Sequence, residues 1–597
     1  MPSYNAPLRD MKFLLHELLE APAKLTTYES FAEVEQDLLD AILEESGKFS
    51  SEVLAPLNVV GDQEGCTRHD DGSVTTPAGF KEAYKTMVDN GWVSLGHPTD
   101  YGGQGLPGVL NIAAGEMQSA ANMAFAMYPG LTNGAIKAIL IGGSEDQKQA
   151  YLPKMVSGEW TGTMNLTEPH CGTDLGLIKT KAEPNADGSY KISGQKIFIS
   201  AGEHDMSENI VHLVLARVQG APEGVKGISL FIVPKFKLDK DGNPSEKNGV
   251  SCGAIEHKMG IHGNSTCVMN YDDAEGYMIG EENKGLRVMF VMMNRARLDV
   301  GMQGLSQSEV AYQNAVAYAK DRLQGRSLTG PKNPEGPADS LIVHPDVRRM
   351  LMETRAFNEG ARALVFWAAL MEDLETVHED EKFRERCDDL LGLLTPVIKG
   401  YLTDMSMVTT INCQQVFGGH GFIEEWGMSQ FVRDNRITMI YEGANGVQAL
   451  DLVGRKLARK GGRALRTYSA EVDKFLADNS DDKAIADFIE ALKDSKAKLT
   501  EATMWLMQNG MSNPDNAGAS SMDYLHIMGL TTFSYMWAKM AVVAQAKIDA
   551  GDKDEFYANK LITGRFFIKR MLPQINAHLA KLKSGAEPVM ALSAQAF

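Results

Sequence analysis

The chain has 597 residues, with 59 basic and 78 acidic side chains and a formal net charge of −19. Its 44% hydrophobic and 23% charged residues are typical of a globular protein, and they exclude a collagen, a disordered chain and a disulfide scaffold. The acidic excess argues against broad binding to nucleic acid or an anionic membrane, because both require a basic face. At roughly 100–200 residues per domain, the length predicts three or four domains.

The sequence also indicates a compartment. No apolar run reaches the roughly 18 residues that a membrane-spanning helix needs, so no membrane span is expected. The first twenty residues lack the order of a secretory signal and carry Asp10, Glu17 and Glu20, which a mitochondrial presequence avoids. Six scattered cysteines without a C-x-x-C pair are typical of a reducing compartment, and no metal site is expected. We therefore expect a cytoplasmic protein.

The first 280 residues change from a helical to a strand pattern. Residues 1–160 are predicted to be mostly helical because their apolar stripes recur at helical spacing. Ser144 and Gln147 form a capping box that begins a helix, and Gly142-Gly143 is expected to close the helix before it. Short β-rich runs bounded by turn residues follow at 190–200, 210–218, 227–236 and 266–280. This pattern predicts a small β-domain inserted into a helical protein.

Helical patterning returns after Glu282. Residues 288–323 predict one long helix, and 324–345, with four prolines and three glycines, predict a long loop. Helices are predicted again from 346 to about 460, where Gly461-Gly462 is a stop signal. Residues 465–597 predict a further helical unit, in which 509–521 is a loop by composition.

Two motifs of the β-rich segment are candidates for binding. The stretch 163–182 is a turn with hydroxyls at Thr167 and Thr173, which can present hydrogen-bonding groups to a planar cofactor or simply lead into the β-domain. In GQKIFIS (194–200), Phe198 and Ser200 occupy alternate strand positions and are predicted to share one face. The alternative is that Phe198 is a core residue.

Two further motifs lie in the second helical segment. Three glycines in QQVFGGHGF (414–422) allow a phosphate to approach the backbone closely, although this is neither a P-loop nor a dinucleotide fingerprint. Glu442 follows an apolar run and precedes the turn 443–446, so it is a candidate general base whose pKa is raised by desolvation. A carboxylate that merely stabilises a helix N-terminus is the alternative.

Taken together, the motifs LTEPHCGTD, GQKIFIS, KMGIHGNST, FGGHGF and IYEGANGVQ resemble the acyl-CoA dehydrogenase family from about Glu33 to Lys460. The resemblance implies a mainly α fold with an inserted small β-domain: a helical domain, a β-barrel domain and a four-helix-bundle domain. The extra C-terminal helical domain resembles a large-subunit subclass. The implied domain boundaries are an N-terminal extension at 1–32, then 33–160, 161–282, 283–462 and 463–597.

The resemblance assigns roles to individual residues. Glu442 matches the catalytic base, while Thr173, Arg297 and Tyr441 match contacts to the acyl-CoA substrate. The family's cofactor is FAD, and its contacts match Met164, Leu166, Thr167, Gly172, Thr173, Phe198 and Ser200, with Arg322, Gln415 and Gly419 reaching the FAD of a neighbouring subunit. The chain departs from the family pattern at Ala444, at Gly446 and in the enlarged loop 324–345.

The implied activity is α,β-dehydrogenation of an acyl-CoA thioester, in fatty acid β-oxidation or methylthio-acyl-CoA catabolism. The implied electron acceptor is an electron-transfer flavoprotein. An acyl-CoA oxidase and a catalytically silent acyl-CoA-binding protein remain alternatives. The apolar stripe Leu525, Met528, Phe533, Trp537 and Met540 predicts that the C-terminal unit packs on the protein's own helices and leaves a homodimer.

Overall fold

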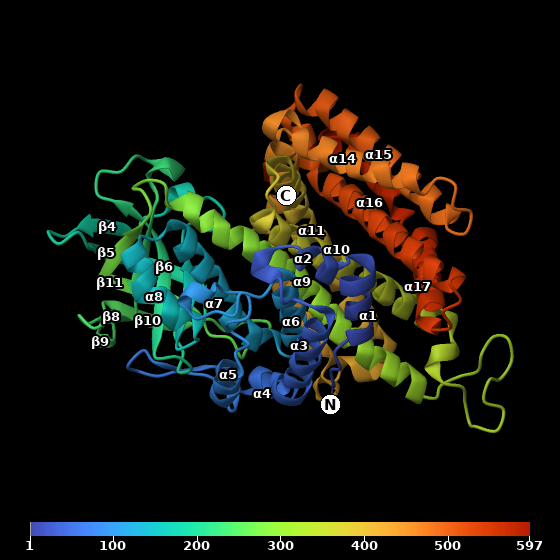
Figure 1. Cartoon of the computed structure of the whole chain (residues 1–597), viewed down its shortest axis with the longest axis horizontal. Helices are drawn as coiled ribbons and strands as arrows, with labels where there is room; N and C mark the ends of the chain where they lie inside the picture. The colour runs from blue at the N-terminus through green and yellow to red at the C-terminus, as the bar shows by residue number, and fades with distance from the viewer. Residues whose placement is uncertain (1) are drawn as a thin grey trace. The chain divides into compact units, whose positions relative to one another are not determined.

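Figure 1 shows the computed structural model, which describes residues 2–597. The chain divides into two compact units. One unit is Glu45–Asp299, and the other combines the chain before Glu45 with Val300–Phe597.

Helices make up the first part of the unit Glu45–Asp299. Ser144 accepts a hydrogen bond from the backbone N–H of Gln147, whose side chain accepts from the N–H of Ser144, so the predicted capping box is confirmed. The preceding helix ends at Gly142, as predicted. A two-stranded hairpin of β1 (Thr67–Arg68) and β2 (Val74–Thr75) interrupts the helices. The helices are α3 (Gln36–Phe49), which begins before the unit, α4 (Ala55–Glu64), α5 (Phe80–Asp89), α6 (Gly108–Ala121), α7 (Met123–Gly142) and α8 (Glu145–Val156).

The predicted β-domain follows these helices. Pairings of β11 with β5, β5 with β4, β4 with β6, β6 with β7 and β7 with β11 close a ring of five strands, which makes the domain a barrel. β3 lies parallel to β6, β10 is antiparallel to β11, and β8 and β9 form a separate hairpin. The strands are β3 (Trp160–Asn165), β4 (Lys181–Pro184), β5 (Tyr190–Ser200), β6 (Asn209–Val218), β7 (Ser229–Pro234), β8 (Phe236–Leu238), β9 (Pro244–Lys247), β10 (Val250–Ile255) and β11 (Thr266–Ile279).

The central strand β6 is buried on both faces, which explains its nearly unbroken apolar sequence. Val211, Leu213 and Leu215 pack in one cluster with buried residues of α7 and α8. Val214 and Ala216 point to the opposite side and pack with residues of β5, β10 and β11. Alternate side chains of β6 thus point in opposite directions: one set fills the barrel, and the other packs the barrel against the helices.

Long helices dominate the second unit. The predicted helix over 288–323 is confirmed as the single helix α9 (Gly285–Asp321), which runs into this unit from the other. α10 (Pro345–Val377) and α11 (Glu381–Val416) form an antiparallel hairpin. Shorter helices follow: α12 (Met428–Arg436), α13 (Asn445–Asp451) and α14 (Arg463–Asp478).

The C-terminal helices pack on the same unit, as predicted. α16 (Pro514–Asp549) contacts α10, α11 and α13, and Leu525, Met528, Phe533, Trp537 and Met540 are at most 1% exposed. Figure 1 shows α16 running beside α15 (Ala486–Gly510), which the contacts between them confirm. The remaining helices are α17 (Glu555–Phe566), α18 (Gln574–Ser584) and α19 (Glu587–Met590).

α16 also has the length and hydropathy of a possible membrane span. An 18-residue window of this helix has a mean hydropathy of 1.2, and 83% of the window is buried inside the structure. No such helix was expected from the sequence, because polar residues interrupt the apolar pattern of α16. A buried core helix meets the same criterion, and the packing of α16 against α10, α11 and α15 accounts for its apolar surface.

The N-terminal extension is tied into the second unit by buried charges. Asp10 of α1 (Leu8–Lys12) contacts Arg362 of α10 at 2.5 Å and also accepts a hydrogen bond from Lys560 of α17. Arg362 reaches Glu309 of α9 at 3.0 Å, and Lys560 reaches Glu359 of α10 at 2.7 Å. Arg362 and Lys560 are each 1% exposed. One ionic network therefore joins the N-terminal extension, the central helices and the C-terminal helices.

The prediction of a loop over 509–521 is wrong. α15 continues to Gly510 and α16 begins at Pro514, so only residues 511–513 separate the two helices. Asn513 caps α16 by accepting the N–H of Asp515, and Pro514 occupies the first helical position, where its missing N–H costs nothing. The predicted loop 324–345 contains only the short 3-10 turn Leu341–Val343 before α10 begins at Pro345.

Candidate functional site

The first group of predicted residues lies where β3 ends beside β5. Met164 belongs to β3, and Leu166 and Thr167 follow it directly. The carbonyl of Thr167 accepts the N–H of Ile197 at 2.9 Å, which attaches the turn to β5. The three predicted side chains are half-buried, and no residue among 2–597 hydrogen-bonds the hydroxyl of Thr167. This hydroxyl is available to a ligand.

Phe198 and Ser200 lie on the accessible side of β5. Phe198 is 59% exposed and Ser200 is half-buried, whereas Ile199 between them is buried. The backbone of Phe198 has φ +59°, the left-handed conformation that is uncommon outside glycine, and the pairing of β5 with β11 shifts register nearby. Within the described chain, the hydroxyl of Ser200 has no partner. Phe198 is therefore not a core residue, and its ring offers an aromatic face beside a hydroxyl.

A buried ion pair holds this face in place. Lys196 of β5 is 0% exposed and donates to Glu168 at 2.8 Å and to the carbonyl of Leu166 at 3.0 Å. Glu168 also accepts the N–H of Lys179 at 2.6 Å and both the N–H and the hydroxyl of Thr180. The pair thus joins the turn after β3, the segment before β4 and the strand that carries Phe198.

The protonation of this pair follows from its surroundings. Burial alone would raise the pKa of Glu168, but Lys196 and the donors of Thr180 and Lys179 outweigh it and hold that pKa below its usual range. Burial lowers the pKa of Lys196 against the opposing attraction of Glu168. The short contact and the four donors on the carboxylate support a charged pair.

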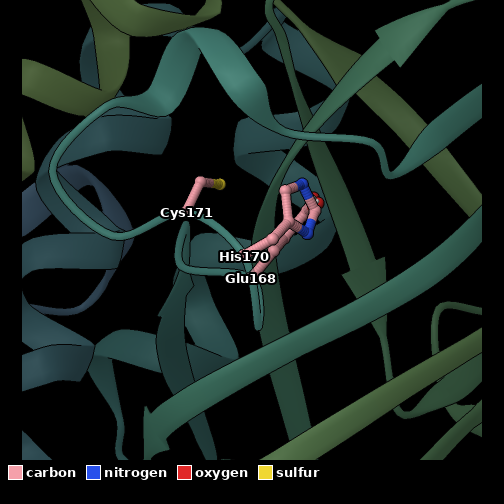
Figure 2. Close-up of side chains that lie close together, drawn as sticks. All are labelled: Glu168, His170 and Cys171. Carbon is pink, nitrogen blue, oxygen red and sulfur yellow. Dashed lines mark ion pairs between the residues drawn. The ribbon is translucent and has the colours of Figure 1, made fainter.

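Glu168, His170 and Cys171 form a compact group with the residue types of a metal site. Figure 2 shows the three side chains, whose ligand atoms all lie within 4.8 Å of one another. Glu168 already accepts four hydrogen bonds, and Nε2 of His170 donates to the carbonyl of Leu177 at 2.8 Å. The pKa of the Cys171 thiol is raised, mainly by burial, which disfavours the thiolate that a metal needs. These hydrogen bonds give Glu168 and His170 a structural role in the turn and account for the cluster without a metal ion.

Gly172 and Thr173 form the exposed rim of the same turn. Both residues are exposed, and a Cβ on Gly172 would have no atom within 4 Å. Backbone at this position is open to a ligand. Arg297, the predicted nucleotide contact, lies on α9 in this unit and is only 5% exposed.

The second group surrounds Glu442, in the other unit. Glu442 lies between the turn Ile437–Met439 and α13, with φ +56°, and Gly443 follows with φ +90°. Nε2 of Gln448 donates to the carbonyl of Glu442 at 3.1 Å and to that of Gly443 at 3.0 Å. The carbonyls of the turn are therefore held from inside α13.

Tyr441 anchors the other side of this turn. Its hydroxyl donates to Oε1 of Gln303 on α9. Burial, followed by the charge of Glu442, raises the pKa of the Tyr441 hydroxyl well above its ordinary value, so the phenol remains a hydrogen-bond donor. Tyr441 thereby fixes the start of the turn to a long helix.

The third group contains the predicted cross-subunit residues. Arg322 directly follows α9, Gln415 lies in the last turn of α11, and Gly419 lies in the 3-10 turn Gly418–Phe422; all three are exposed. A Cβ on Gly419 would meet nothing within 4 Å. Apolar side chains around these residues are also exposed, among them Phe422 at 86% and Ile411 at 48%.

The structure therefore brings the predicted residues together in groups within each unit. Met164, Leu166, Thr167, Gly172, Thr173, Phe198, Ser200 and Arg297 belong to Glu45–Asp299, and Arg322, Gln415, Gly419, Tyr441 and Glu442 belong to the other unit. None of the motif assignments included Lys196, Gln448 or Asn445, whose side chains hold these groups through hydrogen bonds. A lysine inside an apolar strand and two amides beside a glycine turn were the available signals.

The accessible face fits a planar cofactor with hydrogen-bonding edges. An exposed aromatic ring, the available hydroxyls of Thr167 and Ser200, and the open backbone at Gly172 are the groups that such a ligand needs. The turn at Glu442, in contrast, presents a carboxylate on a left-handed backbone, a conformation that neighbouring residues must stabilise. A strained, well-supported residue of this kind is typical of a reactive site.

Sequence comparisons define the class of protein. Family models match an acyl-CoA dehydrogenase N-terminal domain at 41–159, a middle domain at 163–274, a C-terminal domain at 283–457 and an acetyl-CoA dehydrogenase C-terminal-like domain at 468–593. The chain belongs to the acyl-CoA dehydrogenase family, which confirms the resemblance inferred from its motifs.

Individual relatives extend over the whole chain. The 3-methylmercaptopropionyl-CoA dehydrogenase of Ruegeria pomeroyi is 42% identical, with 99% of this chain and 100% of the relative covered. A butyryl-CoA dehydrogenase of Syntrophomonas wolfei is 35% identical, with 100% of this chain and 99% of the relative covered. The fold is similar to that of an acyl-CoA dehydrogenase from Bacillus anthracis complexed with FAD, with a TM-score of 0.75, 22% identity and coverage of 92% and 88% of the two chains.

Proposed function

We propose that this protein catalyses the FAD-dependent α,β-dehydrogenation of an acyl-CoA thioester to the trans-2-enoyl-CoA, with Glu442 as the general base. The observation that carries the proposal is the turn of Glu442, whose left-handed backbone is held on both sides by Tyr441 and Gln448. Such strain costs about 1–3 kcal/mol and persists only where the surroundings enforce it. The full-length relatives named for acyl-CoA dehydrogenation support the same reaction.

Glu442 removes the proton from the α-carbon of the thioester. That proton is only weakly acidic, so the carbonyl oxygen must be stabilised as negative charge develops on it. We assign this role to the backbone N–H of Glu442, whose orientation is set by the same turn. Positioned general-base catalysis contributes about 10²–10⁴-fold to the rate, and orientation of the thioester contributes further.

The residues of the accessible β5 face would hold FAD. Phe198 would cover the ring, Thr167 and Ser200 would hydrogen-bond its edge, Met164 and Leu166 would line its face, and Gly172 and Thr173 would admit its pyrophosphate. Arg322, Gln415 and Gly419 of a second copy would contact the adenine end in a homodimer. When bound, FAD supplies the acceptor for the hydride that leaves the β-carbon.

The substrate needs local positive charge because the protein is acidic and CoA is anionic. We propose that Arg297 binds the nucleotide part of CoA, that Thr173 also contacts the acyl-CoA, and that Tyr441 lies against the acyl chain. An arginine stays charged even when buried, which suits a guanidinium that is 5% exposed. We propose an electron-transfer flavoprotein as the electron acceptor.

The assignment of the base is tested with Glu442→Gln. The amide keeps the volume and hydrogen bonding of the side chain but cannot accept the α-proton. We expect the variant to stay yellow and bind acyl-CoA, while substrate reduces its flavin at least about 10²-fold more slowly in stopped-flow absorbance. Glu425→Gln, the same change at an exposed glutamate of the turn Glu424–Trp426, is the matched control and keeps the normal rate.

Two results would contradict the assignment. Loss of FAD from Glu442→Gln would show that Glu442 has a structural role. Near-normal flavin reduction would place the base elsewhere, with Asp299 as the first alternative. Oδ1 of Asp299 lies 3.3 Å from Nε of Arg295 on α9. The positive charge of this arginine stabilises the carboxylate and makes Asp299 a weaker base than Glu442.

The substrate class is tested with a series of acyl-CoA thioesters from C4 to C18 together with 3-methylthiopropionyl-CoA. The 42% identical relative supports the methylthio substrate as the one with the highest kcat/KM. Hydrogen peroxide formed with acyl-CoA as the sole substrate would reveal an oxidase instead. A colourless protein that binds acyl-CoA without turnover would contradict an enzymatic function altogether.

A further inference from the structure

The turn of Glu442 is supported from outside as well as from within. Asn445, the first residue of α13, lies three positions after Glu442 and is 5% exposed. Its side-chain oxygen accepts from Nζ of Lys399 at 2.7 Å, and its Nδ2 donates to Oδ1 of Asp404 at 2.6 Å. An ammonium only donates and a carboxylate only accepts, so these two charges on α11 fix the orientation of the amide.

Asp404 carries this support to the C-terminal helices. Its second oxygen, Oδ2, accepts from Nε2 of His526 on α16 at 2.8 Å. The carboxylate is 13% exposed and the imidazole 15%, so the contact is largely protected from water. Hydrogen bonds to an ionised carboxylate in such surroundings are roughly twice as strong as neutral ones.

The imidazole of His526 is itself held in place. It stacks on His578 of α18 with ring centroids 4.7 Å apart, and Nδ1 of His578 contacts Asp523 of α16 at 2.8 Å. Lys581 of α18 pairs with the same carboxylate at 2.7 Å. A hydrogen-bonded series therefore runs from His526 of α16 through Asp404 of α11 to Asn445 in the turn of Glu442, and the ring stack on His578 connects it to α18, entirely within one compact unit.

We propose that His526 of the C-terminal domain is a positioning residue for Glu442, acting through Asp404 and Asn445. The inference rests on the proposed function, in which Glu442 is the base. A left-handed turn keeps its shape only while its neighbours hold it. Nδ2 of Asn445 also donates to the carbonyl of Gly400 at 3.2 Å and to Oγ1 of Thr403 at 2.9 Å, so release of Asp404 removes the charged acceptor of the amide and loosens the turn without freeing it. A shift of about 1 Å at a reacting group costs on the order of 10²-fold in rate. The C-terminal domain thereby contributes to catalysis without touching substrate.

His526→Leu removes the donor to Asp404, whereas His526→Gln keeps a side-chain N–H. In the FAD-loaded enzyme we expect His526→Leu to lower kcat by about 10-fold or more with little change in KM or FAD content, and His526→Gln to recover most of that loss. Hydrogen–deuterium exchange of the peptide covering 441–449 is expected to be faster in His526→Leu and near normal in His526→Gln.

His16→Leu is the matched control. His16 makes the same kind of contact to Asp40, at 2.7 Å and with similar burial, but lies in the N-terminal extension, outside the series of contacts that reaches the turn. We expect it to leave kcat and the exchange of 441–449 unchanged.

The outcomes distinguish this inference from the proposed function. If Glu442→Gln is fully active, the assignment of the base fails, and exchange at 441–449 alone decides whether His526 holds the turn. If Glu442→Gln is inactive but His526→Leu exchanges and turns over normally, the positioning role is overturned. A fall in kcat that is not rescued by His526→Gln, or that occurs without faster exchange at 441–449, overturns it as well.

Discussion

A single buried ion pair between Lys196 and Glu168 holds the accessible β5 face in place. Lys196 and Glu168 are 0% and 3% exposed, and together they join β5 to both ends of the turn 166–180. The pair is not itself the most stable solution for a core, because removing two charges from water is costly. Its effect is to join the turn that carries Thr167 to the strand that carries Phe198.

Breaking this pair is expected to be far more harmful than breaking an exposed one. Lys196→Met leaves the buried Glu168 carboxylate without its counter-charge, which costs about 3–5 kcal/mol of unfolding free energy. Lys191→Met on the same strand disrupts a solvent-exposed pair with Asp273 and should change stability by less than about 0.5 kcal/mol. Denaturant unfolding of both variants measures the difference. Equal stability of the two would mean that the buried pair does not support the turn.

At the scale of residues, the sequence predicted which residues are functional candidates, but not their backbone conformation. The motifs identified Phe198 and Glu442 because their residue types and neighbours resemble a known pattern. Neither left-handed φ angle can be derived from an aromatic or an acidic side chain, since both residue types avoid that region when nothing forces them into it. The constraints come from the register shift between β5 and β11 at Phe198 and from the hydrogen bonds of Gln448 at Glu442, and both exist only in the folded structure.

At the scale of elements, periodicity predicted the strands and long helices well. β5 has the predicted bounds Tyr190–Ser200, and α9 is one helix, because apolar patterning and turn residues agree at both places. The failure at 509–521 has a physical reason. Ser520 and Ser521 are buried within α16, where the hydroxyl of Ser520 donates to the carbonyl of Leu582 in α18 at 2.8 Å.

The enlarged loop 324–345 is organised around one carboxylate. Asp339 is buried and accepts the backbone N–H groups of Ser327 at 2.8 Å, Lys332 at 2.9 Å and Asn333 at 2.7 Å. These bonds, that of Ser327 first, hold the pKa of Asp339 below its usual range. The stabilisation of the loop by the ionised Asp339 is therefore fully present above about pH 4, the pKa of an unfolded aspartate. It is lost as the pH falls through the lowered pKa of the folded state.

Asp339→Ala is expected to release this loop without unfolding the helices. Three backbone N–H groups lose their acceptor, so trypsin should cleave after Arg326 or Lys332 at least about 10-fold faster at neutral pH. Asp346→Ala is the control, since Asp346 forms an exposed ion pair with Arg349 just beyond the loop. Unchanged cleavage of Asp339→Ala would show that the loop is held by other contacts.

At the scale of the whole molecule, the extra C-terminal domain is part of a larger core. Its longest helix, α16, packs on α10, α11 and α13, and a network of buried charges joins α17 to the N-terminal extension. The apolar stripe predicted the burial of α16, because a helix apolar on its inner face must cover another surface. The partners in the ionic network were not predictable, because Asp10 and Lys560 are 550 residues apart in the sequence.

This arrangement leads to a prediction about assembly. The C-terminal helices cover α10 and α11 within the same chain, so a surface of this helical unit is occupied before any second copy binds. The surface around Gln415 and Gly419 keeps exposed apolar groups, including Phe422 and Ile411, and is available to a partner. We therefore expect a homodimer with twice the chain mass of 65.2 kDa, stable on dilution, by light scattering coupled to size-exclusion chromatography. A stable tetramer of the intact chain would show that the C-terminal domain does not replace a dimer–dimer contact, and a monomer that retains FAD would contradict the cross-subunit roles of Arg322, Gln415 and Gly419.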